Sequence, residues 1–262
     1  LHLVGVEVRI AELVADGVEI VQQGNRIATN GDVRLSATPG QWDPIGRMVE
    51  RKVDEKTGAV DVIFDPRVAR GVAGHLAAAI NGASVARKTS FLRDMMGKQV
   101  AASAITVTDE PMRRRGQASR PFDGEGVATQ PSRLIDGGRV TGWLLNAASA
   151  RQLGLETTGH ATRGVGGAPG TGATNVHVEP GPLGPAELMA DVERGLYVTE
   201  LIGHGVNPVT GDYSRGASGF VIEKGVIGAA VAEITIAGNL LDLYRSLAAA
   251  NDLEHRRSVN VP

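Results

Sequence analysis

Residues 206–223 read VNPVTGDYSRGASGFVIE, and beyond Lys224-Gly225 a second apolar stretch ends as EITIAGNL at residues 233–240. Two apolar runs separated by a short break that contains glycine are typical of a β-hairpin. The stretch therefore predicts antiparallel strands over residues 219–236 that turn at Lys224-Gly225.

Strand patterns also dominate the rest of the chain, and the predicted strands mostly follow one another without an intervening helix. Asp16-Gly17 and Asn30-Gly31 have the composition of hairpin turns. This order predicts an α+β fold with a mostly antiparallel sheet and a few flanking helices, rather than a doubly wound sheet. The predicted strands cover residues 3–10, 18–21, 59–64, 99–109, 139–145 and 196–202, and the predicted helices cover 43–53, 66–80, 185–194 and 239–250.

The composition excludes several classes of site. The 262 residues include no cysteine, which excludes a disulfide scaffold, a thiolate metal ligand and a cysteine nucleophile. A net charge of −2 gives no support for direct binding to nucleic acid or to an anionic membrane. No apolar run approaches the ~20 residues needed to span a bilayer, and we expect a cytoplasmic protein.

Two segments have the composition of exposed connections. Residues 110–130 are rich in arginine, but Phe122 is their only aromatic residue, whereas single-stranded nucleic acid is usually bound by several aromatic side chains. Residues 159–172 are rich in glycine, lack a Gly-Lys-Ser/Thr sequence and are interrupted by Pro169. They therefore predict a flexible loop rather than a phosphate-binding loop, and such a loop could also serve as a lid that orders on binding.

A zinc peptidase site needs at least two nitrogen ligands on one rigid element, together with a third ligand. Of the six histidines, only His75 lies on a helix with clear end signals, which are Asp65-Pro66 at its start and Asn81-Gly82 at its end. The helical neighbours of His75 are glycine and aliphatic residues, which cannot bind a metal ion or act as a base. We therefore expect His75 to make a local hydrogen bond.

The remaining histidines and acidic residues give no clear catalytic pattern. His160 and His204 lie beside glycines in predicted loops and are expected to be solvated, although the fold could bring them together. His177 alternates with valines in a strand and is expected either to pack in the structure or to face solvent, and His255 lies in a charged surface run. Ser214 lies near Asp212, but these residues are also common in turns.

Asp123 and Glu125 flank Gly124 and would point to the same side of an extended chain. The simpler interpretation is a turn in which these carboxylates accept hydrogen bonds from backbone amides. Use of the pair as a general acid and base is the alternative.

Nine segments together carry a resemblance to a known family, because each is weak alone but their order and spacing are specific. They are residues 62–68 (VIFDPRV), 74–76 (GHL), 79–82 (AING), 89–92 (TSFL), 122–126 (FDGEG), 157–161 (TTGHA), 174–176 (TNV), 195–203 (GLYVTELIG) and 206–223. Over residues 44–262 the chain resembles the PmbA (TldE) branch of the TldD/PmbA metallopeptidase family. The resemblance is looser before residue 44.

The resemblance implies that this chain is the subunit without zinc ligands. In the TldD branch the first long helix carries a His-Glu-x-x-x-His motif, and a cysteine near the C-terminus is a further ligand. The corresponding positions here are Ala73, Gly74 and Ala78, and the chain has no cysteine. The resemblance therefore implies no catalytic or metal-ligating residue in this chain, no cofactor of its own, and a TldD-like partner that holds zinc.

The resemblance also implies how the chain is organised and what it contacts. Residues 1–56 are expected to be the remnant of a smaller α/β N-terminal domain with its linker, and residues 57–262 the PmbA/TldE-like C-terminal domain. The family usually has one more strand after the position of Pro262. The subunit pair is expected to process peptides in a shared cavity, without nucleic acid or membrane. Candidate residues facing that cavity are Asp123, Glu125, His160, Asn175, Asp212 and Asn239.

Two alternatives remain at this point. The chain could be a homodimeric binding or scaffold protein without peptidase activity, in which the same surface closes on a second copy. The historical name of the family also suggests a regulator of DNA gyrase. The near-neutral charge makes an indirect effect through proteolysis easier to accept than direct binding to DNA.

Overall fold

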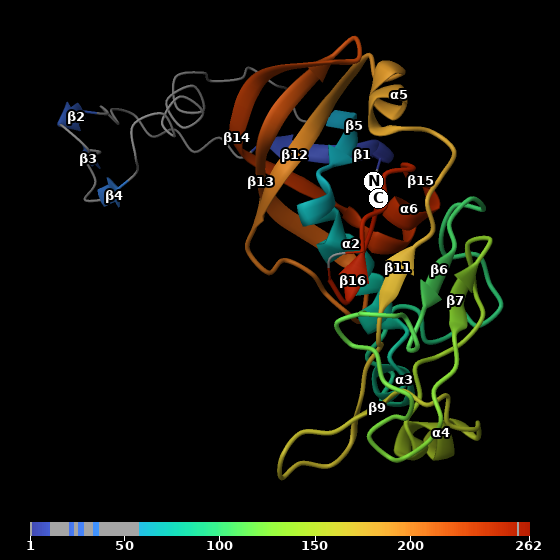
Figure 1. Ribbon diagram of the computed structural model, residues 1–262. Coiled ribbons are helices and arrows are strands. Elements are labelled where there is room, and N and C mark those ends of the chain that lie inside the picture. The colour runs from blue at the N-terminus through green and yellow to red at the C-terminus, as the bar shows by residue number, and fades with distance from the viewer. Residues whose placement is uncertain (1, 11–20, 24–25, 29–33, 37–57, 256) are drawn as a thin grey trace.

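The predicted hairpin is present and its strands are longer than the sequence indicated. β13 (Asp212–Glu223) and β14 (Val226–Asn239) pair antiparallel and turn at Lys224-Gly225 (Figure 1). Both turn residues have positive φ angles, 49° and 76°, a conformation that glycine adopts without steric cost. The computed structural model describes residues 2–10, 21–23, 26–28, 34–36, 58–255 and 257–262.

The hairpin belongs to a sheet with the strand order β14-β13-β12-β5-β1-β15, in which β1 also pairs with β14. Five strands therefore close on themselves, and β15 extends β1 at its other end. All neighbours are antiparallel except β5 and β12, which are parallel. The further strands are β1 (His2–Ile10), β5 (Gly58–Phe64), β12 (Arg194–Ile202) and β15 (Leu247–Ala248).

A second sheet has the order β16-β11-β6-β7-β8, with β11 and β16 parallel and the other pairs antiparallel. Its strands are β6 (Val107–Asp109), β7 (Ser132–Asp136), β8 (Arg139–Val140), β11 (Val176–Val178) and β16 (Val259–Asn260). Two smaller sheets are β9 (Ala161–Thr162) with β10 (Gly170–Thr171), and β2 (Val21–Gln23), β3 (Arg26–Ala28) and β4 (Arg34–Ser36) in sequence order. Both large sheets are mainly antiparallel, as the sequence predicts.

Helix α2 (Pro66–Ala79) lies between the two large sheets, and it contacts β5 and β12 on one side and β11 and β16 on the other (Figure 1). Its start follows the expected signals, because the Asp65 side chain accepts a hydrogen bond from the Arg67 amide and Pro66 is the first helical residue. Its buried residues recur at spacings of three and four, which produces an apolar face for both sheets. They are Ala69, Val72, Ala73, Leu76 and Ala79.

The other helices are short and flank the sheets. Asn81, which follows α2, caps α3 (Gly82–Ala86) through its side chain. Asn146 caps α4 (Ala147–Leu153) in the same way. The remaining two are α5 (Pro185–Ala190) and α6 (Leu240–Arg245).

Four predicted elements are shorter than expected, and one of them is the helix predicted over residues 185–194, which ends at Ala190. Residues 99–106 are irregular, because the amides of Val100 and Ala101 both donate to the Gly138 carbonyl at 2.8 and 3.0 Å instead of to a neighbouring strand. The alternation of apolar residues there reflects burial rather than strand pairing. The strand predicted over residues 139–145 is limited to β8, and the helix predicted over 239–250 ends at Arg245 and gives way to β15.

The N-terminal part of the chain supplies a strand to the large sheet. β1 pairs with β5, β14 and β15, so residues 2–10 complete the sheet formed by the rest of the chain. The helix predicted over residues 43–53 and the two predicted turns at Asp16-Gly17 and Asn30-Gly31 lie outside the described residues. The domain boundary at residue 56 stays a prediction.

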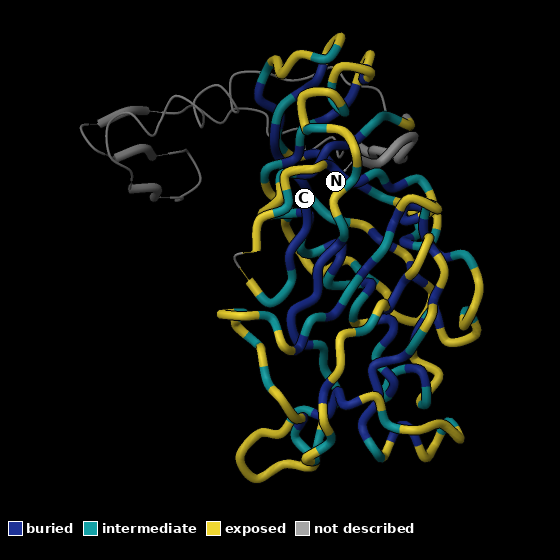
Figure 2. Tube along the Cα trace, turned by 45° about the vertical axis from the view of Figure 1, so that its right-hand side comes forward, coloured by how far each residue is buried: buried dark blue, intermediate teal, exposed yellow. Residues whose placement is uncertain are grey.

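The main hydrophobic core joins α2, both large sheets and α6. Buried segments run through the interior of the molecule, and exposed segments gather at its loops (Figure 2). Tyr244 of α6 is almost fully buried, and its hydroxyl group donates a hydrogen bond of 2.8 Å to the Val72 carbonyl of α2. Burial raises the pKa of Tyr244, so this hydroxyl stays a donor at neutral pH. No helix among the described residues has the length and apolar content needed to cross a bilayer.

We expect Tyr244→Phe to lower the free energy of unfolding by about 1 kcal/mol, because it removes one net hydrogen bond without leaving a cavity. Tyr213→Phe is the matched control, since the buried Tyr213 hydroxyl has no hydrogen-bond partner among the described residues. Urea denaturation of both variants measures the difference. Equal losses in the two variants would contradict the assignment of this hydrogen bond as stabilising.

Candidate functional site

The three positions that the resemblance aligns with a zinc motif, Ala73, Gly74 and Ala78, lie on α2. Ala73 is buried in the core, Gly74 is half-buried and Ala78 is exposed. A Cβ atom added at Gly74 would meet nothing within 4 Å, so there is space beside the helix at this point. The two methyl groups and the hydrogen at these positions offer no lone pair to a metal ion.

His75 does not replace these ligands. Its Nε2 atom is buried without a hydrogen-bond partner among the described residues, and its ring packs edge-on against Tyr213 at a centroid distance of 6.3 Å. Burial and then the nearby Arg215 lower the pKa of His75. Within the described ranges, no group of three or more histidine or acidic side chains is placed to hold a metal ion. These residues do not fit zinc, and no catalytic step can be derived through it here.

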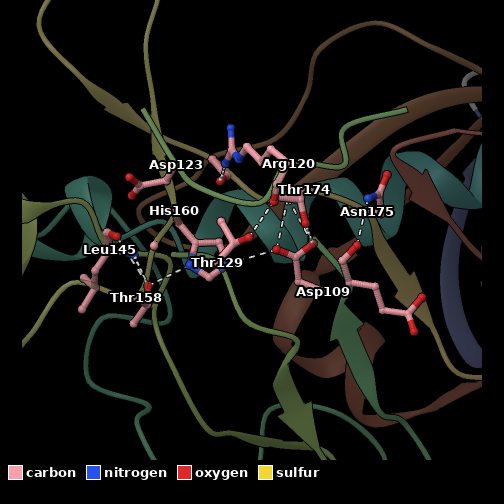
Figure 3. A network of polar contacts seen from close by, with 12 residues as sticks. Asp109, Arg120, Asp123, Thr129, Leu145, Thr158, His160, Thr174 and Asn175 are labelled. Atoms are coloured by element: carbon pink, nitrogen blue, oxygen red, sulfur yellow. Dashed lines mark hydrogen bonds and ion pairs between the residues drawn. The ribbon is translucent and has the colours of Figure 1, made fainter. Parts of the chain in front are cut away.

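A network of buried polar groups surrounds Asp109 at the end of β6 (Figure 3). The carboxylate of Asp109 accepts hydrogen bonds from the Thr174 amide at 3.0 and 3.1 Å and from the Thr174 hydroxyl at 2.6 Å. It also lies 3.0 Å from Nε2 of His160. These contacts join β6 to two loops that are distant in sequence, and they are all made inside the protein.

His160 is buried in this network, and the expectation that it is a solvated loop residue was wrong. Its Nδ1 atom lies 2.8 Å from the Thr158 hydroxyl. An ionised Asp109 accepts a hydrogen bond from the Nε2–H group, which leaves Nδ1 as an acceptor toward the Thr158 hydroxyl. His204, in contrast, is exposed in the loop before β13.

The electrostatics of the network favour an ionised Asp109. Burial by itself would raise the pKa of Asp109, but the hydrogen bonds from His160 and Thr174 outweigh it and the net pKa is lowered. Charge-assisted hydrogen bonds of this kind are stronger than neutral ones. The carboxylate is therefore held as an acceptor at neutral pH.

The order of contacts from Thr158 through His160 to Asp109 resembles the relay of a hydroxyl nucleophile. The Thr158 hydroxyl, however, accepts the Leu145 amide at 2.8 Å and lies 3.1 Å from the Trp143 carbonyl. Backbone groups thus occupy the hydroxyl that would have to attack a substrate. The arrangement fits a structural brace better than a nucleophile.

Asp123 and Glu125 form the turn that the sequence predicts. The Asp123 carboxylate accepts backbone amides from Glu125, Val127 and Ala161, each at 2.9 Å. Burial would raise the pKa of Asp123, and these amides outweigh it and lower the pKa. Glu125 accepts the Ala147 amide at the first residue of α4. Binding to backbone amides is confirmed for both carboxylates.

Asn175 is also buried, and its side chain organises the loop after β6. Its Nδ2 atom donates to the Glu110 carbonyl and to the Ser119 hydroxyl, both at 2.9 Å, and its Oδ1 atom accepts the Ala118 amide at 3.1 Å. Asp123, His160 and Asn175 therefore belong to neighbouring parts of one buried polar region (Figure 3).

Asp212 and Asn239 form a separate pair at the open end of the long hairpin. They are register partners of β13 and β14, and Nδ2 of Asn239 donates to the Thr210 carbonyl at 2.9 Å. The Oδ1 atom of Asn239 accepts the Leu241 amide and caps α6. The structure thus divides the six candidate residues into two groups, and their role toward a substrate stays a prediction.

A cavity of about 470 Å³ lies elsewhere, between the first turns of α2 and strands β12 and β13. Its volume lies in the range of small-ligand sites. None of the six candidate residues lines it. The lining residues are Arg67, Val68, Arg70, Gly71, Thr199, Glu200, Leu201 and Arg215.

Sequence reasoning missed the most connected residues of the site, Asp109 and Thr174. Asp109 and Thr174 are hydrogen-bonded to each other although they lie 65 residues apart in the sequence. No local spacing predicts that contact. The three arginines of the cavity were also missed, because they come from α2 and β13 and meet only in the fold.

The chain is similar to proteins of one family. The model of the PmbA/TldA metallopeptidase C-terminal domain matches residues 57–262. The chain is 44% identical over 216 residues to the metalloprotease PmbA of Escherichia coli O157:H7, covering 82% of this chain and 46% of that protein. It is 45% identical over 205 residues to the PmbA homolog of Haemophilus influenzae, covering 78% of this chain and 44% of that protein. The chain thus spans about half the length of these relatives.

Solved structures agree with this similarity. TldE from Thermococcus kodakarensis matches with a TM-score of 0.69 and 26% identity, over 77% of this chain and 47% of that one. A candidate modulator of DNA gyrase from Bacteroides thetaiotaomicron matches with a TM-score of 0.76 and 27% identity, over 90% of this chain and 56% of that one. The α+β architecture seen here is the one these proteins share, and the chain belongs to the PmbA/TldD metallopeptidase family.

Proposed function

We propose that this chain is the non-catalytic subunit of a two-subunit zinc metallopeptidase. The observation that carries the proposal is the chemistry of α2 at Ala73, Gly74 and Ala78, where no side chain can bind zinc or act as a general base. The absence of cysteine from the sequence supports it. Family membership supplies the metallopeptidase context.

The partner in this proposal is a TldD-like subunit that holds the zinc ion and supplies the catalytic groups. This chain is also related to a TldD homolog of Haemophilus influenzae, at 27% identity over 168 residues. Two subunits with related folds can meet through equivalent surfaces and enclose a cavity between them. The substrate is a peptide taken into that cavity, and the pair works in the cytoplasm.

In this assembly the residues of this chain shape the shared cavity and orient the peptide. The partner subunit carries out the bond cleavage. The buried brace around Asp109 ties β6 to the segments that carry His160 and Thr174, and Asp123 is bonded to Ala161, the residue after His160. Substrate could contact exposed edges of these loops and the hairpin end at Asp212 and Asn239.

We expect the purified chain alone to give no metal-dependent peptide cleavage, and to restore or increase cleavage when mixed with a TldD-type subunit. Zinc analysis together with native mass spectrometry identifies which subunit holds the metal ion. The control is a partner whose two motif histidines are replaced by alanine, which should still bind this chain but stay inactive. Metal-dependent cleavage by this chain alone would contradict the proposal.

The name of the Bacteroides relative raises gyrase regulation as a second candidate. The near-neutral charge of the chain favours an indirect route, through cleavage of a protein that acts on gyrase. A salt-dependent DNA titration separates the routes, because direct binding would weaken steeply as salt is added. A homodimer without a partner would appear in the same native mass spectrum.

A further inference from the structure

The cavity beside α2 is a built feature with an unusual balance of charge. It is formed by the first two turns of α2, by residues Thr199–Leu201 of β12 and by Arg215 of β13. Three arginines and a single acidic residue, Glu200, line it. Of the remaining four lining residues, Thr199 is polar, whereas Val68, Gly71 and Leu201 are apolar or lack a side chain. This mixture suits a ligand with both charged and apolar parts.

Two of the arginines are not neutralised by a carboxylate. Arg67 makes a forked ion pair with Asp65, through Nε at 2.8 Å and Nη2 at 3.1 Å. Among the described residues, the Arg70 side chain donates only to the Arg67 carbonyl, and the Arg215 side chain only to the Leu201 carbonyl. Within the described part of the chain, neither Arg70 nor Arg215 has an ion-pair partner, so the cavity keeps two free positive charges on adjacent walls.

Polar atoms without partners in the described part of the chain lie at Arg215 and at two nearby residues that do not line the cavity, His75 and Tyr213. Nε of Arg215, Nε2 of His75 and the Tyr213 hydroxyl are buried, and none has a hydrogen-bond partner among the described residues. His75 and Tyr213 are in edge-on contact, and Arg215 follows Tyr213 by two residues on the same strand face. Buried polar groups nearly always have a hydrogen-bond partner in native proteins. A polar ligand near Arg215 would supply such a partner for its guanidinium group.

We propose that this cavity binds a carboxylate group of a peptide, with Arg70 and Arg215 as its cationic partners. Arginine presents parallel N–H groups that match the two oxygens of a carboxylate. Glu200 lies in the same cavity, where its charge opposes a doubly charged phosphate more strongly than a singly charged carboxylate. The choice of a peptide as the carrier of the carboxylate rests on the proposed function.

Isothermal titration calorimetry on the full chain, with no partner and no zinc, tests this inference. Three acetylated alanine–glycine pentapeptides are compared: one with a free C-terminal carboxylate, one with a C-terminal amide and a central glutamate, and one with an amide and a central glutamine. We expect at least one carboxylate peptide to bind about tenfold or more tightly than the neutral peptide, as a charge-assisted hydrogen bond implies. The first two peptides distinguish a peptide terminus from an acidic side chain.

The variants connect that preference to the cavity. Arg215→Met should remove the preference for the carboxylate peptide, and Arg70→Met should reduce it. Arg215→Lys should keep part of the preference, because lysine retains the positive charge but lacks the paired N–H groups of the guanidinium. Glu200→Gln should strengthen binding of the carboxylate peptide by removing a like charge. Arg87→Met is the control, since Arg87 is exposed at the end of α3 and outside the cavity.

Three results would overturn the inference: equal binding of neutral and carboxylate peptides, no measurable binding of either carboxylate peptide, or an unchanged preference in a folded Arg215→Met or Arg70→Met variant. Circular dichroism and thermal melting establish that each variant is folded, and the two arginines provide independent variants. The cleavage assay of the proposed function gives an independent result. Partner-dependent cleavage can persist when the cavity binds no carboxylate, and the cavity can bind a carboxylate when no cleavage occurs.

Discussion

Asp109→Asn is expected to lower the free energy of unfolding by about 3 kcal/mol, because it weakens hydrogen bonds to a buried charge and leaves a buried donor without an acceptor. Asp109 is fully buried and accepts hydrogen bonds from Thr174 and His160. Asparagine has nearly the same shape but carries two donor hydrogens where the carboxylate had an acceptor. At least one of the surrounding donors would then face another donor without a partner.

Urea denaturation at neutral pH measures this effect. Asp136→Asn is the matched control, because Asp136 is an exposed aspartate at the end of β7 whose side chain pairs, among the described residues, only with Arg133, at 3.3 Å. Removal of a surface ion pair typically costs less than about 1 kcal/mol. The brace assignment is wrong if Asp109→Asn destabilises no more than the control.

The same variant has a characteristic pH dependence. The pKa of Asp109 in the folded protein lies below its ordinary value of 3.8. The stability it contributes is therefore complete above about pH 4 and is lost as the pH falls through the lower value of the folded state. Asp109→Asn lacks this proton equilibrium. The difference between wild type and variant should shrink below about pH 4, because only the wild type loses this contribution there.

Elements with local signals could be predicted from the sequence alone. The start of α2 is set by Asp65 and Pro66, and the turn of the long hairpin by Lys224-Gly225. The Asp123 turn was predicted for the same reason, because its carboxylate binds amides two and four residues away. In each case the deciding interaction lies within a few residues of the signal.

Elements that depend on distant partners could not be predicted in this way. His160 reaches Asp109 across 51 residues, so the glycines beside His160 indicated only a loop and gave no sign of burial. Residues 99–106 have apolar spacing typical of a strand, but their amides bind the Gly138 carbonyl and prevent a ladder. The cationic cavity likewise requires α2 to meet β13, which depends on the topology rather than on any motif.

Gly219→Ala is expected to destabilise the protein by about 3 kcal/mol, at the upper end of the usual cost of overpacking. Gly219 is buried in β13 opposite Val198 of β12, and the pairing shifts register on either side of it. A Cβ atom at Gly219 would lie 2.0 Å from the Tyr197 carbonyl oxygen and 3.0 Å from the Val198 Cα. Both atoms belong to the backbone, so no side chain can rotate away to make room.

Gly216→Ala on the same strand separates this steric effect from the general effect of replacing glycine. A Cβ atom at Gly216 would meet Ile202 at 3.5 Å, which is ordinary van der Waals contact. Replacement of glycine by alanine at a compatible site reduces the entropy of the unfolded chain, and it typically stabilises by about 0.4–1 kcal/mol. We therefore expect Gly216→Ala to be neutral or slightly stabilising.

The location of Gly219 makes the effect larger than that of one local clash. β12 and β13 are neighbours in a sheet that closes through the β1–β14 pair, so separating them at Gly219 strains the whole ring of strands. Thermal melting and hydrogen exchange of both variants test this argument. Exchange should accelerate along β12 and β13 in Gly219→Ala and stay unchanged in Gly216→Ala. If the two variants melt at the same temperature, the close approach of the β12 backbone at Gly219 does not limit stability.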